Sequence, residues 1–535
     1  MAGVKRKNSS SVTPSKKKTS SGKNALLTEK QINELAEQVS NKQYNALVEL
    51  LGQYSHIKAV LLKSENDKVE AQGRLLTVVL FKCFQKLFSD NLLVVKKSYD
   101  DKKTLAIKWL VEKYDAYKTV LLEFLGTELH YDTSLQLDML DIYLNLIKLE
   151  TEHMSADKQY FPTATYKRLV ESLLLSQGSD FIVLQFEETF KTCWDLQFYF
   201  FNGLSETLLE WKESKDSTTL QRVFQNFQAL ALTSKLLFDP ETQAEQPTWS
   251  VKDGLLPSVA YKPSHFKSQF QKAIVAILSY PMLTGQYKAI LLILHKRIIP
   301  YMAQPQNLMD FLTDSYNVTD DDVVPILALN SLYELMKRYN LEYPDFYSKL
   351  YSLLTSQLLY TRYRSRFFRL CDLFLTSTHL SSNLVASFIK RLARLSLRSS
   401  ASGAVIVIPF VYNLMKRHPA CMVMLHRPDV SANEYSDPFL ADEQDPLKTG
   451  AINSSLWELE TLMSHYHPNI ATLAKIFGEP FRKHSYNMED FLDWSYITLL
   501  DSEKTRRYRA PAALEFQEWD GLMAGENSYM EGWTF

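Results

Sequence analysis

The sequence predicts an all-α protein, a degenerate solenoid of HEAT- or armadillo-like helical repeats preceded by a disordered basic tail. Glycine is scarce, with 15 residues among 535, whereas an all-β protein needs glycine in its many tight turns. Apolar residues recur at three- and four-residue intervals in segments of about 12 to 20 residues, which is a usual helix length. Because the sequence has no strict period, the repeats are predicted to be degenerate.

Two segments show this apolar pattern most clearly. The stripe of the first segment consists of Leu135, Met139, Ile142, Leu146 and Leu149. The stripe of the second segment consists of Leu220, Val223, Phe224, Phe227 and Leu230. Each set lies on one face of a helix, so both segments are predicted to pack that face against neighbouring helices.

Shifts in composition divide the chain into five predicted regions. These are a disordered tail (1–24), an amino-terminal helical repeat region (25–238), a proline-rich linker (239–265), a carboxy-terminal helical domain (266–509) and an acidic, aromatic tail (510–535). The most apolar run, at 404–415, is shorter than the roughly 20 residues that span a bilayer. We therefore predict a buried helix there, with Pro409 in its first turn or at a kink.

The first 24 residues carry seven basic side chains and no acidic one, although the whole chain has a net charge of −1. Such a composition cannot bury enough apolar area to offset the entropy of ordering, so this tail is predicted to be disordered. Its basic triplets are Lys5-Arg6-Lys7 and Lys16-Lys17-Lys18. Their spacing resembles a bipartite nuclear localisation signal, and a solvated tail with weak RNA affinity is the alternative.

The segment 454–477 predicts a helical hairpin. Apolar residues from Leu456 to Met463, Trp457 among them, share one face of a first helix. Pro468 disfavours a helical backbone at His467, so the chain should turn there before a second helix begins.

The motifs of common enzymes are missing from the sequence. It contains no G-x-x-x-x-G-K-[ST], G-x-G-x-x-G, H-E-x-x-H, G-x-S-x-G or paired C-x-x-C pattern. His465 and His467 could chelate a metal only on an extended backbone, and their ligand set is incomplete. We expect these histidines and Tyr466 to pack and form hydrogen bonds at the helical break. The sequence thus predicts a non-catalytic protein without a metal or cofactor.

The four cysteines are far apart and lie in apolar segments. They are Cys83, Cys193, Cys371 and Cys421. This usage predicts buried, inert thiols in a reducing compartment.

A basic constellation lies between residues 362 and 398, where the only acid is Asp372. It consists of Arg362, Arg364, Arg366, Arg369, Lys390, Arg391, Arg394 and Arg398. The region is predicted to contain a helix that includes Lys390, Arg394 and Arg398. Its apolar residues form the core face, which leaves these three basic residues as an outward stripe. Like charges at this spacing repel, so an anionic partner, either RNA or an acidic protein, would relieve the repulsion. Alternatively, neighbouring helices neutralise the charges, with Arg366 or Arg369 paired between repeats.

Four blocks of the sequence resemble the CCAAT-binding-factor-like domain of the nucleolar ribosome-assembly proteins. The blocks are LALNSLYELMKRYNLEYPDFYSKLY (327–351), YRSRFFRLCDLFLTSTHL (363–380), IVIPFVYNLMKRHP (406–419) and the hairpin at 454–477. They occur in the order that the family shows. The hairpin contributes a signature whose implied role is structural: Trp457, His465, Tyr466, His467 and Pro468.

The resemblance implies a non-catalytic scaffold of the nucleus and nucleolus that acts in small (40S) ribosomal subunit biogenesis, within the early pre-ribosomal particle. It implies a complex with nucleolar protein 14, docked on the carboxy-terminal domain. Other small-subunit processome proteins and pre-ribosomal RNA are further implied partners, and no membrane or small-molecule substrate is implied. The chain length and Asp437-Pro438-Phe439 fit the small-subunit branch of the family better than the large-subunit branch. The alternative is a helical-repeat nuclear transport or chromatin-associated scaffold.

Overall fold

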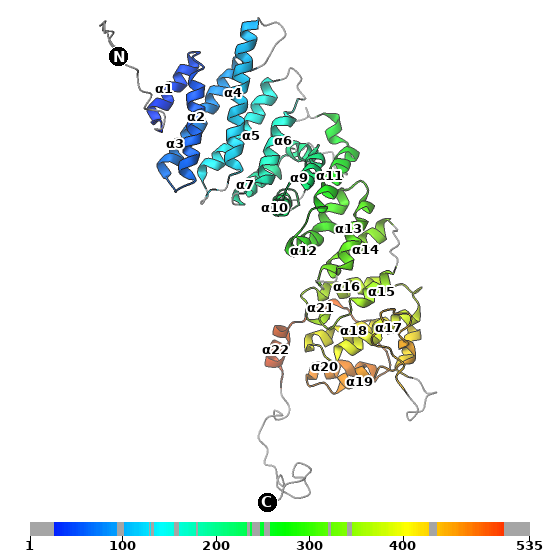
Figure 1. The fold of residues 1–535 in the computed structure, drawn as a ribbon. Coiled ribbons are helices and arrows are strands. Elements are labelled where there is room, and N and C mark those ends of the chain that lie inside the picture. The colour runs from blue at the N-terminus through cyan, green and yellow to red at the C-terminus, as the bar shows by residue number, and fades with distance from the viewer. Residues whose placement is uncertain are drawn as a thin grey trace, which may run out of the picture. The chain divides into compact units, whose positions relative to one another are not determined.

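The computed structural model confirms the all-α prediction, because every regular element in its described residues is a helix (Figure 1). It describes residues 26–93, 101–127, 129, 133–154, 160–177, 180–232, 236–237, 247–250, 257–318, 321, 323–339, 345–426 and 436–507. The basic tail (1–24) with its two lysine- and arginine-rich triplets, and the acidic, aromatic tail (510–535), lie outside the described residues. The chain forms two compact units, 1–313 and 314–535.

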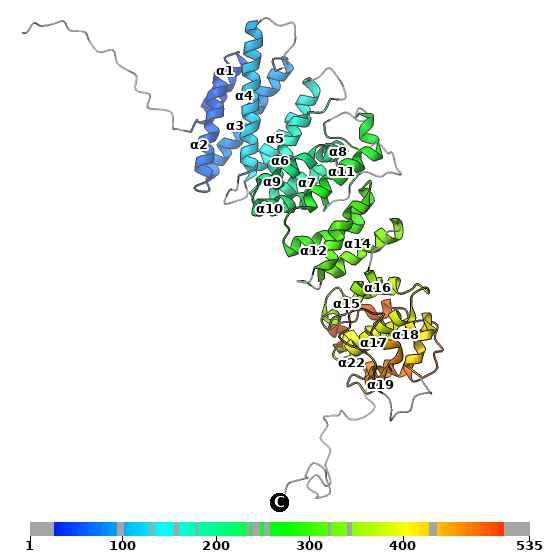
Figure 2. The same cartoon turned by 45° about the vertical axis from the view of Figure 1, so that its right-hand side comes forward.

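The first unit is a row of helices, each packed against near neighbours in the chain. They are α1 (Glu29–Ser40), α2 (Ala46–Leu61), α3 (Asp67–Ser89), α4 (Asp101–Leu125), α5 (Ser134–His153), α6 (Thr163–Leu175), α7 (Phe181–Phe190), α8 (Trp194–Phe201), α9 (Leu204–Ser214), α10 (Ser217–Phe227), α11 (Pro263–Leu278) and α12 (Thr284–Ile293). Helix α3 packs on α5, α4 on α5 and α6, α6 on α10, and α9 on α11. Helices α1 to α5 lie side by side in both views, which is the arrangement of a helical repeat solenoid (Figures 1 and 2).

Local sequence explains where several of these helices begin and which face they bury. The side chains of Asn66 and Thr133 accept hydrogen bonds from backbone N–H groups in the first turns of α3 and α5. The two apolar stripes lie on α5 and on α10 with the π-helical turn that follows it, Gln228–Leu232. All ten stripe residues are buried, so both amphipathic predictions are confirmed.

The proline-rich segment at 239–265 was expected to divide the chain, but the two units divide at Thr313 instead. Within this segment, Trp249 and Ser250 donate backbone hydrogen bonds to the buried Asp195 carboxylate of α8, at 2.8 and 2.9 Å. The Trp249 indole also donates to the Leu144 carbonyl of α5. Prolines mark where helices stop, but these hydrogen bonds still hold 247–250 within the first unit.

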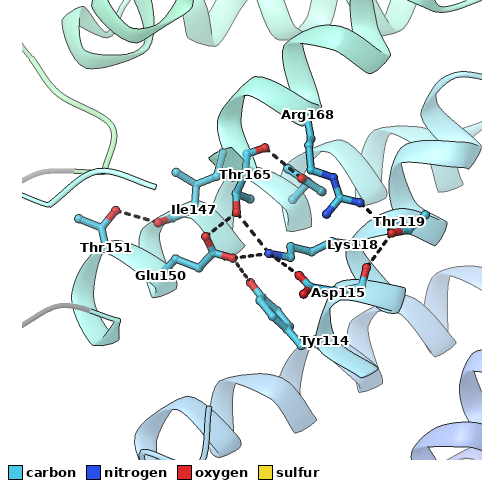
Figure 3. Close-up of polar contacts among 10 residues, drawn as sticks. Tyr114, Asp115, Lys118, Thr119, Ile147, Glu150, Thr151, Thr165 and Arg168 are labelled. Atoms are coloured by element: carbon cyan, nitrogen blue, oxygen red, sulfur yellow. Dashed lines mark hydrogen bonds and ion pairs between the residues drawn. The ribbon is translucent and has the colours of Figure 1, made fainter. Parts of the chain in front are cut away.

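A buried polar cluster joins α4, α5 and α6 (Figure 3). Glu150, which is 1% exposed, lies 3.0 Å from the Lys118 ammonium and accepts hydrogen bonds from the Tyr114 and Thr165 hydroxyls, both at 2.7 Å. Asp115 forms a second ion pair with Lys118 at 3.1 Å. Burial, with a further contribution from the Glu150 charge, raises the pKa of Tyr114, so this phenol stays protonated and donates. The cluster fixes the register of three helices that apolar packing alone would define less sharply.

The second unit is built around α18. Its helices are α14 (Val323–Tyr339), α15 (Phe346–Ser352), α16 (Arg364–Phe374), α17 (Ser382–Ser396), α18 (Ala401–Arg417), α19 (Trp457–Met463), α20 (Pro468–Ala474), α21 (Glu489–Leu492) and α22 (Tyr496–Thr505), while α13 (Met309–Asn317) contains the boundary. Helix α18 contacts α17, α20, α21 and α22. All its residues from Ala401 to Met415 are buried, as predicted for this apolar run, and Pro409 lies in the middle of the helix. None of the described helices is long and apolar enough to span a bilayer.

Replacing Lys118 with Met should strongly destabilise the first unit. The change leaves the Glu150 carboxylate buried without its cation, which costs about 3–5 kcal/mol in comparable sites. Hydrogen exchange of α4 to α6 in the full chain measures this loss as faster local opening. Adding Glu150→Gln removes the buried charge and should restore most of the protection, whereas Lys108→Met, at an exposed position of α4, should change little. Equal effects of Lys118→Met and Lys108→Met would contradict a structural role for the cluster.

Candidate partner-binding surface of the second unit

The structure places the basic constellation on α16, on α17 and beside them, and it corrects the predicted outward stripe. Lys390 is completely buried, Arg394 is half-buried and Arg398 is exposed. The apolar periodicity of α17 predicted most of its core face, where Leu384, Val385, Phe388, Ile389 and Leu392 are buried. The periodicity did not reveal that residues 436–463 cover the opposite side of this helix around Lys390.

A charge cluster, defined here as Lys390, Arg394, Asp437 and Glu458, explains how a lysine can be buried. The Lys390 ammonium lies 2.7 Å from a Glu458 carboxylate oxygen and 3.6 Å from Asp437, and it donates to the Ser455 carbonyl at 2.7 Å. Glu458 is also completely buried, and Arg394 approaches it at 3.5 Å. With two cations and two anions, the cluster is neutral as a whole. It therefore gives no surplus positive charge to an anionic partner.

Two aromatic rings enclose the charge cluster. Phe439 and Trp457 each lie 5.5–5.7 Å from the charged groups of Lys390 and Arg394, within the range of cation–π attraction. Trp457, expected on an apolar face, keeps 41% of its surface exposed. Trp457 of the sequence signature thus adjoins a buried charge and remains partly exposed to solvent.

Asp437 is stabilised as an anion in this cluster. Burial acts to raise its pKa, but hydrogen bonds from Ser454 and the Phe439 N–H, together with the charges of Lys390 and Arg394, hold the pKa below its ordinary value. Because the folded-state pKa is lowered, Asp437 stabilises the fold above the pKa of the unfolded chain. That contribution is lost as the pH falls through the folded-state value.

Two further members of the constellation, Arg369 and Arg391, are engaged by groups inside the unit. Arg369 forms a two-pronged contact with Glu489 of α21 at 2.8 and 2.6 Å, so its predicted pairing between helices is confirmed. Arg391 donates to the Leu354 carbonyl and stacks over the Tyr351 ring. Arg366 has one terminal nitrogen buried without a hydrogen-bond partner among the described residues. Burial lowers the pKa of Arg366.

No described carboxylate lies within ion-pair distance of Arg362, Arg364 or Arg398. Arg362 and Arg398 are exposed. Arg364 is half-buried and donates to three neutral oxygens, from Leu359, Ser402 and Trp494. Arg362 and Arg398 therefore expose a positive charge to an outside anion, and Arg364 has one without a described counter-ion.

The signature hairpin has the predicted form, with α19 ending at Met463 and α20 beginning at Pro468. His465 accepts a hydrogen bond from the His467 N–H, and the His467 ring accepts one from the Asn469 N–H in the first turn of α20. These contacts confirm the structural role predicted for the histidines. Tyr466 meets its expectation only in part, because its ring lies beside those of His465 and His467 but its side chain is 82% exposed.

All four cysteines are free and buried, as predicted. Burial raises the pKa of Cys421 to about 11, and that of Cys371 is raised further, so neither thiol ionises near neutral pH. Among the described residues, no group of histidine, cysteine and acidic side chains has the arrangement of a metal site.

Two protein families match the chain, one in each unit. Residues 325–474 match the CBF/Mak21 family, and residues 20–216 match the TPR repeats of the nucleolar complex protein 4-like family. Nucleolar complex protein 4 of Saccharomyces cerevisiae is 42% identical over 92% of this chain and 94% of its own length. The chain belongs to the nucleolar complex protein 4 family. Its homologue in Gallus gallus is 33% identical over 78% of the chain and 82% of its own length.

Family membership confirms the resemblance that the sequence blocks indicated. Members of the nucleolar complex protein 4 family are nucleolar, and their role lies in ribosome biogenesis. The CBF/Mak21 match runs from the first turn of α14 to the end of α20, so the whole charge cluster lies inside the family domain. The repeat match covers α1 to α9, which form most of the first unit.

Replacing Lys390 with Met should destabilise the second unit, whereas Arg398→Met should leave it unchanged. The first substitution leaves the buried Glu458 with only the half-buried Arg394 at 3.5 Å, at a cost of up to about 3–5 kcal/mol. The second removes an exposed charge without a described partner. Thermal unfolding and hydrogen exchange of α17 and α19 in the full chain provide the comparison. If both variants unfold at the same temperature, Lys390 does not have the structural role assigned to it.

Proposed function

We propose that this nucleolar complex protein 4 family member is a non-catalytic scaffold in small (40S) ribosomal subunit biogenesis. It acts in the nucleolar pre-ribosomal particle, in rRNA processing, assembly and export, as a complex with nucleolar protein 14. The observation that carries the proposal is the 42% identity to the yeast protein over 92% of the chain, because it spans both compact units. An activity that depended on one domain alone would not require similarity of this extent.

The structure supports a scaffold through the character of its surfaces. Stacked helices in the first unit offer an extended face, which suits partners that wrap along it. In the second unit, the ionisable side chains at Lys390 and Glu458 are used to hold helices together. The cysteines are buried and protonated at neutral pH, so they are unsuited to nucleophilic chemistry.

Support for the small-subunit branch comes from Asp437-Pro438-Phe439. Asp437 accepts a hydrogen bond from the Phe439 N–H and approaches Lys390, while the Phe439 side chain is 9% exposed and lies beside the same lysine. The element expected to fit the small-subunit branch better is therefore part of the framework around α17. We expect nucleolar protein 14 to dock on the second unit that this framework stabilises.

Purifying the tagged full chain from cells under native conditions, and sequencing the RNA that accompanies it, tests this function. We expect small-subunit precursor RNA and nucleolar protein 14 to be enriched over a preparation from cells that express the tag alone. Nuclease treatment before capture should release the RNA and leave nucleolar protein 14 bound, because the protein contact is direct. Large-subunit precursor would place the chain in the other branch. Absence of ribosomal RNA would favour the nuclear transport or chromatin-associated scaffold.

The basic tail should direct nuclear entry without contributing to the stability of the fold. Replacing Lys5, Arg6, Lys7, Lys16, Lys17 and Lys18 with alanine removes both triplets at constant chain length. Fluorescence microscopy should then show a larger cytoplasmic fraction, with thermal unfolding unchanged. In a matched control, Ser9, Ser10 and Ser11, which lie between the triplets, are replaced with alanine. This change should not alter localisation. Normal nuclear entry of the alanine variant would mean that the chain is carried in by a partner.

A further inference from the structure

The second unit contains an open pocket that the scaffold role does not explain. Its volume is about 340 Å³, which lies within the range of small-ligand sites. It lies where the 3₁₀ turn Leu358–Tyr360 and α16 meet the first turns of α18 and α22. Its chemistry is set by Tyr360, Arg362, Arg364, Ser402, Asp493 and Tyr496.

The described lining has a net positive charge, because Arg362 and Arg364 outnumber its one acid, Asp493. Arg364 is half-buried, and its three hydrogen bonds all go to neutral oxygens. Burial lowers its pKa, as expected for a cation removed from water without a counter-ion. Arg362 is exposed beside it. Asp493 is exposed and lies 3.8 Å from Arg369, a residue that does not line the pocket.

Two helices add to this positive potential because they begin at the pocket. The Ser400 hydroxyl accepts a hydrogen bond from the Gly403 N–H at the start of α18, and Ser495 does the same for the Thr498 N–H at the start of α22. Both serines line the pocket. Helix N-termini carry partial positive charge, so they reinforce the preference of the arginines for an anion.

Exposed aromatic rings at the same pocket favour a nucleotide over an acidic peptide. Tyr360 is 52% exposed and Tyr496 is 59% exposed, although phenol rings usually bury most of their surface. The Tyr360 hydroxyl donates to the Arg398 carbonyl at 2.7 Å, which fixes the position of its ring. Arginines for phosphate next to aromatic rings for bases are the combination by which proteins bind single-stranded nucleic acid. An acidic peptide would use the arginines but leave the rings uncovered.

We propose that this pocket binds a nucleotide of single-stranded RNA, with the phosphate at Arg362 and Arg364 and the base against Tyr496 or Tyr360. The proposal rests on the ribosome-biogenesis function for the origin of the RNA. The pocket offers positive charge and aromatic rings for stacking, and both attract a nucleotide whichever base it carries. Binding should therefore depend little on the RNA sequence.

Binding of a fluorescent oligouridine of about ten nucleotides to the full chain tests the pocket. Arg362→Glu should weaken binding about tenfold and reduce the salt dependence by about one phosphate contact. Tyr496→Ala, which removes a stacking ring, should weaken it by about five- to tenfold. A matched control, Arg482→Glu, makes the same charge change at an exposed position of this unit outside the pocket and should alter affinity less than about twofold. Arg364 is left intact, because it holds α16 to α18 and to Trp494.

A second readout separates the pocket from the basic tail, which is present in every variant. Ultraviolet crosslinking of the RNA, mapped by mass spectrometry, should label the peptide that contains Tyr360 or Tyr496. Crosslinks elsewhere only, or equal weakening by Arg362→Glu and Arg482→Glu, would overturn the proposal. Arg362-dependent binding of a glutamate-rich peptide without RNA binding would also overturn it, in favour of a protein partner. If the intact chain still purifies with small-subunit precursor in these cases, only the pocket assignment fails and the proposed function stands.

Discussion

The buried ion pair between Lys390 and Glu458 is the constraint on which the second unit depends. Neither side chain retains any exposure, and each charge would be costly to bury alone. The pair therefore requires α17 and the start of α19 to lie in one particular register. The Glu458 carboxylate is within ion-pair distance of Lys390 but receives no well-aligned hydrogen bond. It is therefore stabilised mainly by the neighbouring positive charges. Asp437 and the rings of Phe439 and Trp457 complete an enclosure built from residues far apart in the chain.

The first unit uses the same physical device with different groups. Lys118 and Glu150 are both buried, and hydroxyl groups from Tyr114 and Thr165 satisfy the carboxylate. Apolar stripes on helices of a degenerate repeat fit more than one neighbour, because hydrophobic contact has no direction. A charged pair with defined partners has one satisfactory arrangement. Such clusters suit a protein whose repeats differ in sequence and whose helices must each keep their place in the row.

Five arginines of the basic constellation fall into two groups with different consequences for function. Arg369, Arg391 and Arg394 are engaged by groups of the unit itself and contribute to its architecture. Arg362 and Arg364 adjoin a pocket in which neutral oxygens and helix N-termini surround the guanidinium groups. A count of basic residues in the sequence merges these two groups. The geometry separates them and identifies which arginines have positive charge left for an outside partner.

The sequence by itself determined the helical class, the amphipathic faces of α5 and α10, the hairpin broken before Pro468 and the burial of the cysteines. These features follow from residue periodicity and from the ring of proline, which act over a few residues. Only the tertiary structure decided that Lys390 is buried, that Tyr466 is exposed, that 247–250 stays within the first unit and that Arg364 lines a pocket. Lys390 donates to a carbonyl 65 positions away, and Arg364 to one 130 positions away. A local pattern holds no information about such contacts, because they depend on how distant segments fold over each helix.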